Sequence, residues 1–238
     1  MENAGYATLS RQTGLMREMR MVANNIANSA TSGYRSEGLI FSEYVQTMPG
    51  QESISMSRAN IFNTSMEQGQ LTKTGGTFDF AIEGDGYFMI ETPQGERLTR
   101  AGVFSPNAAG DLVTMDGYRV LDAGRAPVFV PGTAEIINVG ADGTITADGN
   151  TIGQIGLFKP VEAHTMNRED GVMFRVDGDI EDSETATMVQ GYKEGSNVNA
   201  ILEVSRMIEI QRAYEMGQSF LETEDQRIRS AISNLIKT

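Results

Sequence analysis

In this 238-residue chain, the side chains that could most readily bind a metal or take part in catalysis are acidic residues beside glycine turns. Asp177, Asp179 and Glu181 stand at alternate positions, as the first calcium ligands of an EF-hand loop do. Such a loop also needs glycine at its sixth position and glutamate at its twelfth. Asp182 and Met188 stand there instead, so this segment is interpreted as a solvated acidic loop.

Other residues that could support catalysis form equally incomplete sets. Glu83 and Asp85 could act as the carboxylate pair of a glycosidase, but both lie at an expected hairpin tip, where acidic residues favour turns. His164 is the only histidine and there is no cysteine, which argues against most metal and triad chemistry. We predict no active site, no metal and no cofactor. A glycosidase or a calcium-dependent binding module is the alternative from another functional class.

The net charge of −13 is concentrated in the middle of the chain. Residues 1–35 have four basic and two acidic side chains, and residues 201–238 have five basic and six acidic ones. An acidic centre argues against a nucleic-acid partner, which needs a concentrated basic surface. The start, "MENAGYATLSRQTGLMREMR", has no signal-peptide pattern, and no apolar run approaches the roughly 20 residues that cross a bilayer. We therefore expect no cleaved signal peptide and no membrane insertion.

Apolar residues at helical spacing predict a long helix near each end of the chain. In residues 3–28 they recur every three or four positions, and in residues 199–236 they repeat every seven. Asn197 or Asn199 is expected to cap the second helix. Because both helices have an apolar stripe, we expect them to pair in a coiled-coil-like arrangement. The other interpretation is that they pack on the core of a single globular domain.

Between the helices, glycine turns separate short segments of alternating polarity. Asp116-Gly117, Asp142-Gly143 and Asp148-Gly149 are hairpin signals, and turns about every 8–12 residues are typical of antiparallel sheets. The predicted fold class is therefore α+β. The predicted terminal helical domain comprises residues 1–35 and 199–238. Extended connectors, residues 36–72 and 186–198, join it to a central antiparallel β domain, residues 73–185.

Three motifs resemble signatures of the flagellar rod and hook family. "NNIANSATSGYR" in 24–35 resembles its N-terminal pattern, N-N-I/L-A-N followed by T/S-x-G-F/Y-K/R. "EGSNVNAILEVSRMIEIQRAYEM" in 194–216 resembles its C-terminal pattern, S-N-V-N followed by M-I-x-x-Q-R-x-Y/F-E. "DFAIEGDGYFMI" and "LTRAGVFSPNAAGDLVTMDGYRVL" resemble its inner β domain. Three motifs in the right order, over most of the chain, are more specific than any one of them.

The resemblance implies a structural subunit of the bacterial flagellar rod that catalyses nothing. Its implied partners are copies of itself, other rod subunits and the flagellar type III export apparatus, and its implied place is the basal body, across the periplasm. The short chain and its first residues favour a proximal-rod member, with a distal-rod paralogue as the alternative. Helices that complete their core only against neighbours would be cleaved in the monomer, so limited proteolysis is expected to leave roughly 70–190.

The asparagines at the end of the first helix are more numerous than a helix end needs. Asn28 and Gly33 suffice for a C-terminal cap, because glycine permits a left-handed turn. We therefore expect the asparagines to contact neighbouring subunits as well as backbone groups of the helix end. The residues predicted to mediate assembly are Leu9, Met16, Met19, Asn24, Asn25, Ile26, Asn28, Gly33, Met207, Tyr214, Leu221 and Ile228.

Overall fold

A computed structural model describes residues 2–46 and 54–236, with side chains in residues 8–39 and 63–234. The fold is α+β, with a long helix towards each end of the chain and antiparallel strands between them. The chain forms two compact units. The helical unit comprises Met1–Ala27, Ser36–Ser65 and Val198–Thr238, and the β unit comprises Asn28–Arg35 and Met66–Asn197.

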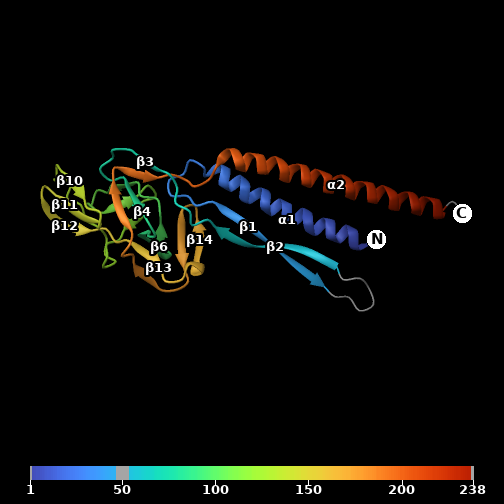
Figure 1. Cartoon of the computed structure of the whole chain (residues 1–238), viewed down its shortest axis with the longest axis horizontal. Helices are drawn as coiled ribbons and strands as arrows, with labels where there is room; N and C mark the ends of the chain where they lie inside the picture. Colours follow the sequence, from blue (N-terminus) through green and yellow to red (C-terminus); the bar gives the residue numbers. More distant parts are fainter. Residues whose placement is uncertain (1, 47–53, 237–238) are drawn as a thin grey trace. The chain divides into compact units, whose positions relative to one another are not determined.

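The helical unit contains two helices and one β-hairpin among its described residues. They are α1 (Glu2–Ala27), β1 (Glu37–Gln46), β2 (Ile54–Thr64) and α2 (Ala200–Ile236). Helix α1 contacts both α2 and the hairpin, and the two helices lie side by side in Figure 1. The hairpin is antiparallel and pairs Glu37 with Thr64 at one end and Gln46 with Ile54 at the other.

The helix boundaries agree closely with the sequence pattern. Helix α2 begins at Ala200 because Asn199 caps it: its side-chain oxygen accepts hydrogen bonds from the backbone N–H groups of Ile201 and Leu202, both at 3.2 Å. The side chain of Asn197, the other predicted cap, instead donates to the carbonyl of Glu67 at 2.9 Å within the β unit.

A small apolar core holds the two helices of the helical unit together. Val22 and Met21 of α1 and Ile210 of α2 are buried in it. The partly buried apolar residues that pack around this helical core are Leu15, Met19, Ile26, Leu39 and Met207.

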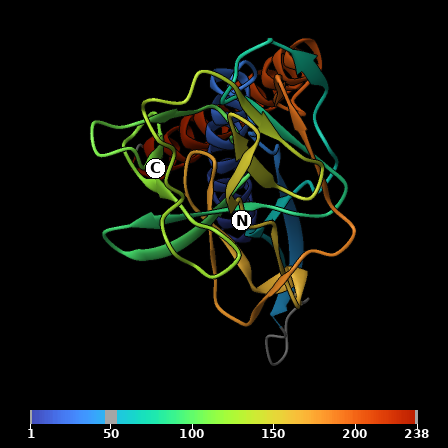
Figure 2. The ribbon, with the colours of Figure 1, turned by 90° about the vertical axis from the view of Figure 1, so that its left-hand side faces the viewer.

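The β unit is built from short antiparallel strands that can be followed in Figure 2. They are β3 (Leu71–Lys73), β4 (Phe80–Glu83), β5 (Phe88–Thr92), β6 (Gly95–Thr99), β7 (Phe104–Pro106), β8 (Leu112–Thr114), β9 (Arg119–Val120), β10 (Ile137–Val139), β11 (Thr144–Ala147), β12 (Asn150–Gln154), β13 (Phe158–Pro160), β14 (Met166–Asp170), β15 (Met173–Val176), β16 (Ile180–Asp182), β17 (Thr187–Gln190) and β18 (Tyr192–Glu194). A short 3₁₀ helix, Ala163–Thr165, precedes β14.

The largest sheet has the strand order β14-β15-β6-β5-β9-β8-β7. Strands β10, β11 and β12 form a second sheet. Three two-stranded sheets pair β13 with β16, β17 with β4, and β18 with β3. The predicted hairpin turns occur where expected. At Gly117, for example, φ is +84° and the backbone N–H donates to the carbonyl of Thr114 at 2.9 Å, which a glycine allows without strain.

The β unit has an extensive apolar core. Phe80, Phe88 and Phe104 are stacked within one buried cluster, with the rings of Phe88 and Phe104 edge to face at 5.1 Å between centroids. A second cluster centres on Met89 and Phe174. Burial of aromatic rings on this scale stabilises a domain without help from a partner.

The two compact units divide the chain differently from the predicted domains. Residues 28–35, predicted within the helical domain, are bonded to strands of the β unit. Residues 36–72 were expected to form an extended connector with short strands. The described part of this segment, which excludes 47–53, contains the β1–β2 hairpin packed on α1.

Candidate functional site: helix faces and a buried ionic cluster

The predicted face of α1 divides into a packed part and an exposed part. Met19 and Ile26 pack around the helical core, as their spacing indicates. Leu9 and Met16, nearer the start of the helix, keep roughly half and two-fifths of their surface exposed, at 51% and 39%. The first part of this face is therefore left uncovered by the residues that the structure describes.

The predicted face of α2 shows the same division. Met207 packs around the helical core, and Tyr214 and Leu221 are half-buried. Ile228 is exposed over 46% of its surface. The predicted face of α2 is therefore packed at Met207 and exposed at Ile228.

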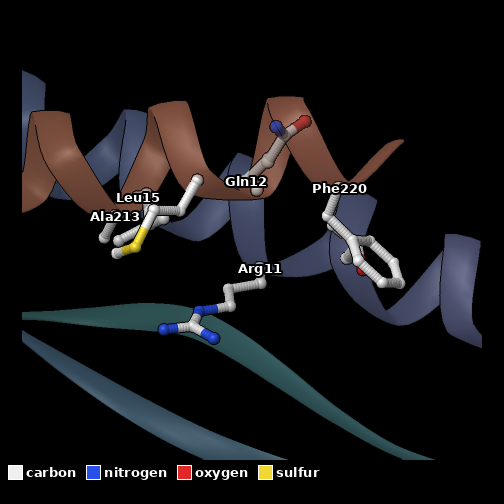
Figure 3. A pocket seen from close by; sticks show the side chains of 8 residues that line it. Arg11, Gln12, Leu15, Ala213 and Phe220 are labelled. Atoms are coloured by element: carbon white, nitrogen blue, oxygen red, sulfur yellow. The ribbon is translucent and has the colours of Figure 1, made fainter. Parts of the chain in front are cut away.

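An open groove of about 310 Å³ runs between the two helices. Its lining includes Arg11, Gln12 and Leu15 of α1 and Ala213 and Phe220 of α2. In Figure 3, Leu15 and Ala213 lie close together, Phe220 projects at the other end, and Arg11 extends towards the ribbon of β2. The groove exposes more apolar than polar surface, so it is suited to covering rather than to polar catalysis.

Several exposed apolar side chains of α2 were not among the predicted assembly residues. They are Ile201, Leu202, Val204, Ile208, Met216, Phe220 and Ile232. The sequence pattern places Val204, Ile208 and Ile232 beside the heptad row, but the assembly prediction took only residues of the row itself. The three-residue spacing from Ile201 to Val204 was the signal that could have added Ile201.

Asn25 ties together three elements of the helical unit. It is fully buried, its amide nitrogen donates to the carbonyl of Glu37 at 2.9 Å, and its amide oxygen accepts from the N–H of Glu37 at 3.0 Å. The amide nitrogen also lies 3.4 Å from a carboxylate oxygen of Glu203 on α2. Its hydrogen-bonding capacity is thus used within the subunit. Asn24 is exposed, and its predicted contact with a neighbour stays a prediction.

Asn28 and Gly33 shape the turn after α1. The side-chain and backbone oxygens of Asn28 accept from the hydroxyl and N–H of Thr31, both at 3.1 Å. Gly33 has a φ of +71°, and a Cβ there would lie 2.4 Å from backbone atoms of Arg100 and Ala101. Only glycine fits this left-handed conformation and this close approach.

A buried ionic cluster lies next to that turn, and the sequence reasoning missed it. Glu194 accepts from Arg35 at 2.8 Å through one carboxylate oxygen and from Arg100 at 3.1 Å through the other. The three side chains are only 0%, 1% and 3% exposed, respectively. The N–H of Gly69 also donates to this carboxylate, at 2.9 Å. A charge so deeply buried is tolerated only when it is paired and hydrogen-bonded as fully as this.

Each charged member of the cluster comes from a different motif of the family resemblance. Arg35 ends "NNIANSATSGYR", Arg100 lies in "LTRAGVF", and Glu194 begins "EGSNVN". Segments far apart in the sequence therefore meet at one carboxylate. The available signal was the presence of a charged residue at the edge of each motif, but a charge in a sequence is ordinarily assigned to the surface.

Burial and charge act in opposite directions on the groups of this cluster. Burial lowers the pKa of Arg35, and the neighbouring Glu194 carboxylate partly offsets that effect. Burial raises the pKa of the neighbouring Tyr87. The positive charge of Arg100, whose guanidinium lies 5.0 Å from the Tyr87 ring centroid, opposes this rise. The two guanidinium Nε–H groups of Arg35 and Arg100 have no acceptor among the described residues.

Arg168 closes the cluster from the β14–β15 side. Its guanidinium stacks over the rings of Tyr34 at 4.5 Å and Phe174 at 5.0 Å, and it donates to the carbonyl of Arg35. Tyr34 and Arg35, the last two residues of the first motif, are thereby held against the main sheet.

The residues considered for other chemistry are occupied or isolated in the structure. Asp177 accepts from Arg175 at 2.8 Å and from Asn167 at 2.9 Å. His164 is largely exposed and lies 3.3 Å from Glu162. Among the described residues, no cluster of three or more potential metal ligands occurs. None of the described helices is both long and apolar enough to cross a membrane.

Comparison with known proteins shows to which protein family the chain belongs. A model described as the flagellar hook protein FlgE/F/G D1 domain matches residues 81–147, and one described as the flagellar basal body rod FlgEFG protein C-terminal matches residues 189–235. Two of the three charged residues of the ionic cluster, Arg100 and Glu194, lie inside these matches. The chain belongs to the family of flagellar basal-body rod and hook proteins, which places it in the flagellar basal body.

Individual relatives narrow the assignment to one member of that family. The chain is 38% identical to the flagellar basal-body rod protein FlgF of Mesorhizobium japonicum, over 90% of each chain. It is 35% identical to FlgF of Caulobacter vibrioides, over 100% of this chain and 99% of the relative. The rod protein FlgG of Agrobacterium fabrum is 33% identical, over 91% and 93%. These comparisons favour the FlgF type over its paralogue FlgG.

Proposed function

We propose that this chain is a structural subunit of the proximal flagellar rod and that its helical unit makes the contacts that build the rod. The exposed apolar surface of α1 and α2 carries this proposal. Leu9, Met16 and Ile228 are exposed on a unit whose own core is small. Exposed apolar surface of this extent is typical of interfaces that are covered in an assembly.

Within the rod, the paired helices would pack in a coiled-coil-like arrangement with helices of neighbouring subunits. The seven-residue repeat of Met207, Tyr214, Leu221 and Ile228 supports this arrangement. Gly217 at an intervening position would weaken a two-stranded coiled coil, so several neighbours are a better fit than one. The partners are copies of this chain and other rod subunits, and together they form the shaft that transmits torque.

The route and place of assembly are part of the same proposal. We propose export through the flagellar type III apparatus without cleavage of a signal peptide, and assembly into a rod that crosses the periplasm. The chain has no cysteine, so its folding after export needs no disulfide formation. The function proposed here involves no catalysis, and the names of the relatives refer to a place in the rod rather than to a reaction.

The test is to place a charge on the exposed helix face. Ile228→Asp or Leu221→Asp should leave the β unit folded but abolish incorporation into the rod, because a carboxylate would be desolvated in the subunit interface. Purified variant protein should keep the thermal transition of the β unit, whereas cells producing it should not swim. Ser230→Asp adds the same charge at an exposed polar position of α2 and is the matched control.

The two variants should separate clearly in a motility assay. Isolated basal bodies from Ile228→Asp cells should lack this subunit by immunoblotting, and those from Ser230→Asp cells should contain it. Normal swimming by Ile228→Asp cells would contradict the proposed assembly surface.

A further inference from the structure

The ionic cluster belongs to the β unit, and one of its members, Arg35, stands at a point where the backbone passes to the helical unit. The chain crosses between them at residues 27/28, 35/36, 65/66 and 197/198. Arg35, Met66 and Asn197 are therefore the β-unit residues next to three of the four crossings. Any force that the backbone carries from one unit to the other passes through the four crossings, and these three residues stand at three of them.

Within the β unit, these crossing residues are bonded to one another or to each other's chain neighbours. The guanidinium of Arg35 donates to the carbonyl of Met66 at 3.3 Å. The N–H of Asn197 donates to the carbonyl of Tyr34 at 3.2 Å, and its side chain donates to the carbonyl of Glu67 at 2.9 Å. Three segments from distant parts of the sequence are thus held at one end of the β unit.

The strands that continue from two of these crossings form a weak pair. The chain enters the β unit at Met66 and continues into β3, and it leaves through β18 and Asn197. Strands β3 and β18 are antiparallel and pair over only three residues, with Leu71 opposite Glu194 at the crossing end. The N–H of Gly195 donates to the carbonyl of Gln70 at 2.9 Å just beyond this pair. Force that separated the two crossings would break these backbone hydrogen bonds one at a time, beginning on the Gly195 side.

Glu194 is placed to prevent that separation. Its carboxylate binds Arg35 beside one crossing, the N–H of Gly69 on the way into β3, and Arg100 next to the main sheet. Its backbone carbonyl accepts from the N–H of Gly33 at 2.9 Å and from the hydroxyl of Ser32 at 2.7 Å. These bonds join all three segments to one residue, so they must break together rather than in sequence.

We propose that Glu194, Arg35 and Arg100 form a clasp that carries force between the backbone crossings and the main sheet of the β unit. Glu194 acts as a positioning residue, because it holds the crossing segments in place without contacting another subunit itself. This inference rests on the proposed function, since only a torque-transmitting subunit experiences such a force.

The first test measures local opening of the clasp in the purified full-length protein. Arg35→Lys keeps the positive charge but loses the geometry that lets one guanidinium reach both Glu194 and Met66. Hydrogen exchange at the N–H groups of Gly33, Gly69, Gly195 and Asn197 should accelerate at least about tenfold, while exchange within β5 and β6 stays unchanged. Glu194→Gln should have a larger effect, and Arg35→Lys keeps the test valid if Glu194→Gln does not fold.

A matched control uses an ion pair on the surface of the same sheet. Glu91 and Arg119 lie 2.7 Å apart and are each nearly half exposed, so Glu91→Gln should leave exchange at all four N–H groups as in the native protein. Unchanged exchange in Arg35→Lys would overturn the clasp. Acceleration spread evenly over β5 and β6 would also overturn it, because the cluster would then serve global stability only.

The second test measures swimming speed as the viscosity of the medium rises. A merely destabilised subunit lowers the number of rods per cell, and hence the fraction of motile cells, without changing how the remaining cells respond to load. Arg35→Lys cells should contain normal amounts of the subunit in their basal bodies but lose speed more steeply with viscosity than Glu91→Gln cells. Identical viscosity curves would overturn the force-carrying role. If Arg35→Lys subunits, which keep the native helix faces, failed to enter basal bodies at all, the proposed function would be contradicted and not the clasp.

Discussion

The β unit and the helical unit bury their apolar residues to different extents, although both are rich in them. In the β unit, the rings of Phe80, Phe88 and Phe104 are buried together in the largest apolar cluster. In the helical unit, the helical core centres on Val22 and Ile210, and Phe220 is 47% exposed on α2. One unit thus stabilises itself, and the other has apolar surface left to bury against partners.

The difference also extends to polar groups. The β unit buries a carboxylate, Glu194, and surrounds it with two guanidinium groups and a backbone N–H. In the helical unit, Arg206 pairs with Glu18 at 2.8 Å and Arg229 with Asp225 at 2.8 Å, in each case with at least one exposed partner. Exposed pairs of this kind contribute little, so most of the stability of the monomer is expected to come from the β unit.

The largest expected effect comes from replacing one phenylalanine by alanine in each unit. Phe88→Ala creates a cavity in the closed core and should lower the free energy of unfolding by about 3–5 kcal/mol. Phe220→Ala removes a ring that is already half exposed and should cost the monomer less than about 1 kcal/mol. Urea denaturation of purified monomers, followed by circular dichroism, measures both values. Equal losses would show that the helical unit is as well packed as the β unit and would remove the physical basis of the comparison.

The second largest effect is expected at Gly33, within the Asn28–Arg35 segment of the β unit. Gly33→Ala would place a Cβ 2.4 Å from the backbone of Arg100 at a φ of +71°, so we expect a loss of about 2–4 kcal/mol. Gly117→Ala is the control, because it has a similar φ of +84° but open space around the Cβ, and should cost about 1 kcal/mol. The melting temperatures of the two variants provide the measurement. A Gly33→Ala protein as stable as Gly117→Ala would mean that residues 28–35 are only loosely attached to the β unit.

The comparison also separates what the sequence could predict from what it could not. Periodicity predicted both helices to within one or two residues, and the Asp-Gly pairs predicted hairpin turns, because both signals depend on neighbours close in sequence. The ionic cluster depends on Arg35, Arg100 and Glu194, which only the folded topology brings together. The expected protease-resistant core of roughly 70–190 would exclude two of these residues, whereas the folded β unit extends to Asn197 and includes Asn28–Arg35.

The asparagines show the same limit at the level of single residues. The composition of the motif indicated more hydrogen-bonding capacity than a helix end requires. The sequence could not indicate that Asn25 bonds to Glu37 and lies beside Glu203, because these partners are 12 and 178 residues away. The use of a polar side chain inside its own subunit or between subunits is decided by tertiary packing.

A smaller effect, confined to the helical unit, is expected from Asn25. Asn25→Ala removes both hydrogen bonds from the part-buried N–H and carbonyl of Glu37 to the Asn25 amide and should destabilise the helical unit by about 1–3 kcal/mol. Asn24→Ala alters an exposed neighbour of the same type and should change stability by less than about 0.5 kcal/mol. Hydrogen exchange along α1 and β1 measures the change where it occurs. If Asn24→Ala were the more damaging variant in the monomer, the assigned internal role of Asn25 would be wrong.

The smallest effect is expected at an exposed turn of the β unit, and it depends on pH. The hydroxyl of Thr144 donates to the carboxylate of Asp142 at 2.7 Å, and its N–H donates at 3.0 Å. These bonds hold the pKa of Asp142 below its ordinary value. A lowered folded-state pKa stabilises the fold at pH values above the ordinary pKa of aspartate, and this contribution is lost as the pH falls through the lowered value.

Thr144→Val removes the hydroxyl bond, so carboxyl NMR should show the pKa of Asp142 moving back towards its ordinary value. The return should be partial, because the bond from the backbone N–H persists. Thr146→Val removes a hydroxyl from the same strand that donates instead to the carbonyl of Asn138, so the pKa of Asp142 should not move. The stability that Asp142 loses on acidification should correspondingly be smaller in Thr144→Val than in Thr146→Val. Identical titration curves for Asp142 in the two variants would show that the hydroxyl bond does not control this group, and that the turns of the β unit are held by their backbone alone.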